Sequence, residues 1–172
     1  MDIQWIHRIL IRDVEALKRE IAAFPDDASV WAVRPGITNP AGTLALHIAG
    51  NLRHFVGAQL GGSDYLRDRP AEFATRDWSR DRLVAELDAA QAAIGATFGG
   101  GRLVDLTAQF PEAVGGYRIV TGDFLIHLAA HLAFHLGQVG YLRRIVTGSP
   151  TTIGTVSIPE LATAVKVPAP TK

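Results

Sequence analysis

The sequence contains no cysteine, and this absence excludes several kinds of site at once. Without thiol side chains the chain forms no disulfide bond, holds no thiolate-bound zinc ion and has no cysteine nucleophile. Basic and acidic residues number 17 each, so the formal net charge is zero. A domain that grips nucleic acid by bulk electrostatic attraction needs an excess of basic residues, so we expect no nucleic-acid partner.

A clear membrane-spanning segment is also missing. Residues 124–142 carry no Asp, Glu, Lys or Arg and approach the spanning length of about 20 residues, but they include three histidines and a glutamine. Polar side chains are costly in lipid, so this stretch is expected to be a core helix with a polar face. The N-terminal segment has an acid at position 2 and does not resemble a signal peptide. We therefore expect a cytoplasmic protein with no membrane partner.

Four segments carry apolar residues at helical spacing. They cover residues 2–23, 40–60, 80–98 and 121–146, and proline or glycine follows each of them. Four amphipathic helices with little strand character indicate an all-α four-helix bundle. At 172 residues the chain has room for one domain, so we expect a single domain over residues 1–172 with a C-terminal tail at about 150–172.

The connections between the helices differ in character. Residues 61–77 are predicted to be a polar loop. In the long connection at residues 102–120, the segments 103–106 and 117–120 have strand character, and Gly115-Gly116 between them predicts a small hairpin. Thr121 is a suitable N-cap for the fourth helix. A connection of this length permits a crossover, and a further short helix is expected near residues 158–164.

Five of the six histidines lie in the second and fourth predicted helices. His127, His131 and His135 follow one another at intervals of four, which places them on one helix face. Two imidazoles one turn apart can bind one zinc ion at about 2.0–2.1 Å if another segment supplies a third ligand, and the second helix offers His47. The alternative is a set of core histidines that are hydrogen-bonded to neighbours, although the flanking Leu, Ala and Phe side chains offer no such partners.

The order and spacing of these histidines resemble the DinB-like superfamily, whose members are metal-binding four-helix bundles. Its hallmarks are a histidine in the second helix and H-x-x-x-H in the fourth, commonly followed by a small residue and Gln. This chain has TLALHIAGNLRHF at residues 43–55 and HLAAHLAFHLGQ at residues 127–138. The resemblance implies that His47, His131 and His135 are the metal ligands. The sequence departs from the pattern at Leu136, where many members have arginine.

Four further side chains are candidates for roles beside the metal. If the second and fourth helices are antiparallel, His54 lies about 10.5 Å beyond His47, which brings it to the level of His127. The two are then candidates for substrate contact or proton transfer, or are simply partly exposed polar residues at a helix end. Asn51 and Gln138 each lie one turn beyond a ligand histidine of their own helix, where they either accept its hydrogen bond or pack between helices.

An imidazole-only ligand set leaves an open coordination position, which is typical of a Lewis-acid site and suits zinc or nickel. The motifs H-E-x-x-H and G-x-S-x-G are absent. The resemblance to thiol-dependent members implies a metal-dependent transferase that uses a small, low-molecular-weight thiol, with isomerase or hydrolase chemistry less favoured. A non-catalytic metal-binding module for stress response or interaction is the alternative. A third interpretation is a helical interaction domain without metal. The resemblance also implies a homodimer.

Overall fold

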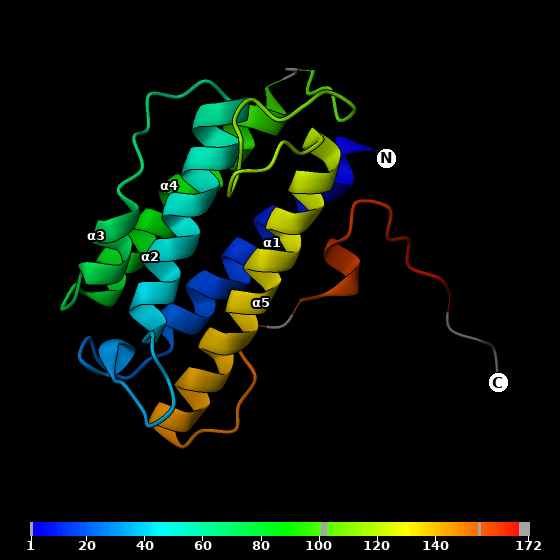
Figure 1. Cartoon of the computed structure of the whole chain (residues 1–172). Helices are drawn as coiled ribbons and strands as arrows, with labels where there is room; N and C mark the ends of the chain where they lie inside the picture. Colours follow the sequence, from blue (N-terminus) through cyan, green and yellow to red (C-terminus); the bar gives the residue numbers. More distant parts are fainter. Residues whose placement is uncertain (1, 101–102, 155, 169–172) are drawn as a thin grey trace.

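A computed structural model describes residues 2–100, 103–154 and 156–168 of the chain (Figure 1). The described residues form five α-helices and no β-strand, and the second α-helix continues directly into a π-helix. Short 3-10 turns lie at Ser29–Trp31 and Ile158–Glu160. The longer elements are α1 (Ile3–Ala22), α2 (Ala41–Leu52), the π-helix η2 (Arg53–Leu60), α3 (Arg69–Ala74), α4 (Arg80–Gly99) and α5 (Thr121–Thr147).

The four long elements pack as a bundle in which α1 and α2 each contact both α4 and α5 (Figure 1). Leucine, isoleucine, valine and phenylalanine fill the space between them, and Leu10, Leu17, Ile48, Leu87 and Leu128 are among the residues with almost no exposed surface. The burial of these apolar side chains stabilises the assembly because it removes their surface from water. The predicted all-α four-helix bundle is therefore confirmed.

The ends of the helices follow local side-chain chemistry. Asp2 caps α1 by accepting a hydrogen bond from the Gln4 backbone N–H at 2.9 Å, and Ser79 caps α4 in the same way. Gly148 ends α5 with φ at +68°. The prediction that Thr121 caps α5 is wrong. Val120 occupies the cap position without a side-chain hydrogen bond, and Thr121 is the buried first residue of the helix. The Thr121 backbone N–H donates to the Ala108 carbonyl of the preceding loop.

Helix α5 contains the nearly charge-free stretch at residues 124–142. This helix packs against α1 and α2 in the bundle. Across the described ranges, no helix combines the length and the hydropathy that crossing a membrane requires.

The predicted hairpin is present in part. Val114 and Tyr117 exchange both backbone hydrogen bonds across Gly115 and Gly116, whose φ angles of +58° and +86° are those of a type I′ turn. The pairing joins residues 109–114 to 117–120 through two isolated bridges. The expectation of a strand at 103–106 is wrong, since that segment has irregular backbone.

The loop predicted at residues 61–77 contains a short helix that the sequence reasoning missed. Helix α3 starts after Asp68, whose side chain accepts from the Ala71 N–H at 3.0 Å, and Pro70 occupies its first turn. The structure thus places an additional helical turn against α2, with which α3 is in contact. The expected helix near 158–164 is reduced to the 3-10 turn at Ile158–Glu160.

A buried ion pair fastens the beginning of the C-terminal segment to the bundle. The Arg143 Nε donates to Glu20 Oε2 at 2.5 Å, and both side chains are nearly inaccessible to water. The Arg143 guanidinium also donates to the Thr151 carbonyl, and the other Glu20 oxygen accepts from the Gly154 N–H at 2.8 Å. Residues 151–154 are therefore held against α1 and α5.

Replacing Arg143 with methionine is expected to lower the free energy of unfolding by about 3–5 kcal/mol, because Glu20 would keep a buried charge without its partner. Urea unfolding followed by circular dichroism measures this. The control is Glu15→Gln, which removes an exposed partner of Lys18 and should cost less than about 1 kcal/mol. Similar losses in the two variants would contradict this account of the pair.

Candidate metal centre

Three histidine rings from two helices meet near the middle of the bundle. His47 comes from α2, and His131 and His135 come from one face of α5. The Nε2 atom of His131 lies 3.3 Å from the Nε2 of His47 and 3.1 Å from the Nε2 of His135. One nitrogen of each ring lies within 4.8 Å of the others, so this cluster could hold a metal ion. The structure thus brings together the three residues that the sequence predicted.

The nitrogen separations fit the coordination of one ion. Two ligands at zinc–nitrogen distances of about 2.0–2.1 Å lie about 3.3 Å apart at a tetrahedral angle and about 2.9 Å apart at a right angle. The separations of 3.3 and 3.1 Å fall within that interval. Two of the three pairs therefore have the spacing of ligands on one ion, and the ligand nitrogens of the third pair, His47 and His135, lie within 4.8 Å of each other.

Hydrogen bonds behind the rings orient their lone pairs. His47 Nδ1 lies 3.0 Å from Glu72 Oε2, and His135 Nδ1 lies 2.7 Å from Gln138 Oε1. Because these oxygens accept, each Nδ1 carries the proton, and each Nε2 directs a lone pair at the centre. Gln138 thus takes the position expected of a supporting acceptor. A metal ion would accept these converging lone pairs, which would otherwise repel one another.

Glu72 and Arg67 support His47 and were not found by sequence reasoning. Arg67 holds the carboxylate with two hydrogen bonds, Nε to Oε1 at 2.7 Å and Nη2 to Oε2 at 2.8 Å. Burial alone would raise the pKa of Glu72, but the hydrogen bonds from His47 and Arg67 outweigh it and hold the pKa below its ordinary value. The buried carboxylate is therefore charged and accepts strongly. The only signal in the sequence was the helix start formed by Asp68 and Pro70.

Gly50 allows Glu72 to approach α2. A Cβ atom built on Gly50 would lie 2.0 Å from Glu72 Oε1 and 2.8 Å from its Cδ. Gly50 is three residues after His47 on the same helix, so it opens the helix surface beside that ring. A glycine in the middle of a helix normally lowers stability, and here it provides the space for a buried carboxylate.

The rings on α5 are held in their neutral form. Burial, followed by the charge that His135 and His47 would carry, lowers the pKa of His131 to about 4. Burial likewise lowers the pKa of His135, against the opposing effect of the Gln138 hydrogen bond. Neutral imidazole is the form that binds metal, so these two side chains are ready to act as ligands near neutral pH.

Of the two roles expected of Asn51, that of acceptor for His47 is excluded. Glu72 occupies that position, and Asn51 is buried with an Oδ1 that has no hydrogen-bond partner among the described residues. The reason is tertiary: α3 brings a carboxylate to His47 from outside α2, and this partner could not be inferred from spacing along α2.

His54 and His127 do not form the predicted pair. His54 lies on the π-helix, and its Nε2 is 2.8 Å from Glu112 Oε1 in the hairpin segment. The exposed His127 ring stacks on that of His131, with centroids 6.1 Å apart and planes 13° apart. The rings of Phe55 and Phe124 contact each other between the two positions. His127 alone of this pair adjoins the three-histidine cluster.

Comparison with known protein families agrees with the fold. Residues 10–139 match the model of a family described as the DinB superfamily. The chain belongs to the DinB superfamily. The match runs from α1 into α5 and includes all three clustered histidines. No curated protein matches the sequence.

Replacing Gly50 with alanine is expected to displace Glu72 and to weaken metal binding about 10- to 100-fold, since outer acceptors tune ligand orientation and basicity. Competition with a chromogenic chelator measures the affinity. The control is Gly95→Ala on α4, where the added Cβ meets no atom within 4 Å. That variant should bind metal normally and gain up to about 1 kcal/mol of stability. Unchanged affinity in Gly50→Ala would show that Glu72 does not need this gap.

The metal-free protein is expected to lose stability between pH 6.5 and about pH 4. The folded His131 has a pKa of about 4 against an ordinary value of 6.5, so the unfolded chain binds a proton in this interval that the folded chain does not. The free energy of unfolding therefore falls as the pH falls. Urea unfolding at several pH values tests this. The His131→Gln variant should have a shallower slope, and an unchanged slope would assign the effect to other groups.

Proposed function

We propose that this DinB-superfamily protein binds one divalent ion, zinc or nickel, through His47, His131 and His135, and that it is a transferase for a small thiol. The observation that carries the proposal is the convergence of three Nε2 atoms, two of which have their lone pairs aimed inward by Glu72 and Gln138. A histidine that binds a metal usually donates the N–H of its other ring nitrogen to a hydrogen-bond acceptor.

The ligand set favours a reactive site over a structural one. Three neutral imidazoles leave a coordination position for a substrate or water, whereas structural zinc sites use four protein ligands. A divalent ion there supplies Lewis acidity, which lowers the pKa of a bound thiol or water. In a transfer reaction the thiol sulfur would lose its proton and bond to an electrophilic carbon, whose leaving group would depart with the bonding electrons.

His127 is the residue proposed to accept the thiol proton. Its exposed ring stacks on His131 and can exchange protons with water. His54 is less suited, because its Nε2 is already paired with Glu112. Glu72 and Arg67 are positioning residues in this scheme: they hold His47 and do not reach the substrate.

The untagged protein is expected to bind one zinc or nickel ion per chain and to lose this binding in His131→Ala, because two imidazoles bind far more weakly than three. Equilibrium dialysis followed by metal analysis gives the stoichiometry. His7→Ala is the control, since His7 lies on α1 and its ring contacts Phe98 instead of the cluster. Absence of metal binding in the unaltered protein would refute the proposal.

Thiol consumption with an electrophile is expected to require the metal and to fall about 10²- to 10⁴-fold in His127→Ala, the range for loss of a general base. The variant should keep its metal, and loss of metal would place His127 among the ligands instead. Metal binding without consumption of any of several small thiols would favour the alternative, a non-catalytic metal-binding module. The homodimer and the cytoplasmic location stay predictions from the sequence.

A further inference from the structure

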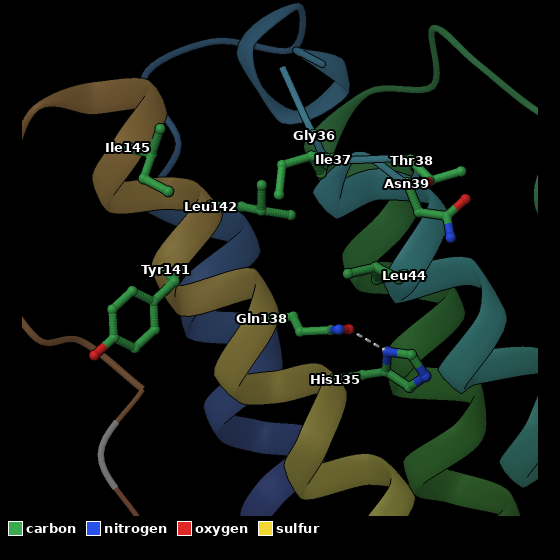
Figure 2. Close-up of a pocket in the computed structure, with 10 residues that line it drawn as sticks. All are labelled: Gly36, Ile37, Thr38, Asn39, Leu44, His135, Gln138, Tyr141, Leu142 and Ile145. Atoms are coloured by element: carbon green, nitrogen blue, oxygen red, sulfur yellow. Dashed lines mark hydrogen bonds between the residues drawn. The ribbon is translucent and has the colours of Figure 1, made fainter. Parts of the chain in front are cut away.

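A cavity of about 370 Å³ opens beside the three-histidine cluster (Figure 2). It lies between the last turns of α5, the start of α2 and the loop that precedes α2. Small-molecule pockets usually occupy about 300–1,000 Å³, so this one suits a small ligand. Its lining residues are Gly36, Ile37, Thr38, Asn39, Leu44, His135, Gln138, Tyr141, Leu142 and Ile145.

The cavity is adjacent to the metal centre because His135 belongs to both. The Nε2 of its ring faces His131. On the other side of the ring, the hydrogen bond that Nδ1 donates to Gln138 Oε1 forms part of the cavity wall (Figure 2). The cavity and the metal centre therefore share the His135 ring, which brings the cavity within reach of a molecule bound to the metal. The other acceptor of the site, Glu72, lines a separate hollow.

The wall of the cavity carries no formal charge. No Asp, Glu, Lys or Arg lines it. Ile37, Leu142 and Ile145 supply apolar surface, and Thr38, Asn39 and Gln138 supply polar groups without charge. Burying a charged group against such a wall is unfavourable because nothing there would pair with it. An apolar group would instead gain from leaving water.

A hydrogen-bonded turn forms the loop wall. Pro35 and Gly36 form a turn in which the Ile37 N–H donates to the Arg34 carbonyl at 2.9 Å, and Gly36 has φ at +78°. Proline followed by glycine is the preferred sequence of a type II turn. The turn directs the Ile37 side chain toward Leu142 (Figure 2). A preformed wall reduces the entropy lost on binding.

We propose that this cavity holds the uncharged body of the thiol whose sulfur binds the metal, with an apolar part of that body against Ile37, Leu142 and Ile145. The inference rests on the proposed function and narrows its substrate class to a neutral thiol bearing an aliphatic or aromatic group. It assigns a specificity role to Ile37, Leu142 and Ile145, which have no part in holding the metal. Thiols with carboxylate or ammonium groups at the far end are disfavoured because the wall would leave those charges unpaired.

The test uses cobalt(II)-loaded protein and straight-chain thiols from ethanethiol to hexanethiol, with the cobalt–thiolate absorption band as readout. The affinity is expected to rise about three- to fourfold for each added methylene until the cavity is full. Thiols of matched length that end in a carboxylate or an ammonium should bind at least about tenfold more weakly than the neutral series.

Ile145→Glu should abolish the rise in affinity with chain length and leave the cobalt content unchanged. The matched control is Ile126→Glu, which changes an equally exposed isoleucine of α5 outside the cavity, 51% exposed against 56% for Ile145. The control should retain the dependence on chain length. Should Ile145→Glu fail to fold, Ile37→Asp in the loop wall gives the same comparison.

The outcomes separate the two proposals. If the affinity measured from the thiolate band is independent of chain length, or is greater for charged thiols, the assignment of the cavity is overturned and the metal site stands. Failure of the unaltered protein to bind cobalt overturns the proposed function itself. Cobalt binding without a thiolate band for any thiol overturns both the thiol chemistry and the cavity assignment.

Discussion

The hydrogen bond from His47 to the buried Glu72 carboxylate is the interaction on which the centre depends. It fixes which nitrogen of His47 faces α5, and it requires a charged group to remain inside the protein. Arg67 offsets that charge, and the missing side chain of Gly50 gives it room. A buried carboxylate is stable only when it is paired and hydrogen-bonded, so α3, its capping by Asp68 and the centre form one unit.

The two sides of the centre are built differently. Helix α2 contributes one ring that is supported by a charged carboxylate, whereas α5 contributes two rings with a neutral amide behind His135. The negative charge adjoins His47, and the side toward the cavity is neutral. The division follows from the architecture: α3 covers one flank of α2, while the loop before α2 leaves space beside α5.

Much of the fold could be predicted from the sequence because it depends on local patterns of residues. The period of the apolar residues located the four long helices, and the i, i+4 spacing placed His131 and His135 on one face. His47 was found because it belongs to a recognised motif. Glu72 was missed, and the acceptor role considered for Asn51 did not hold, for the same reason. The partner of His47 lies on a helix 25 residues away in the chain, and no local spacing reveals it.

The sequence by itself determined the helix periods, the glycine and proline ends, and the set of histidines able to meet. Only the tertiary structure decided which nitrogens converge, that His127 rather than His54 adjoins them, and that an uncharged cavity opens beside His135. Local patterns depend on the steric and hydrogen-bonding preferences of neighbouring residues, whereas the metal centre depends on distances between helices. Those distances are set by how side chains from the whole bundle pack together.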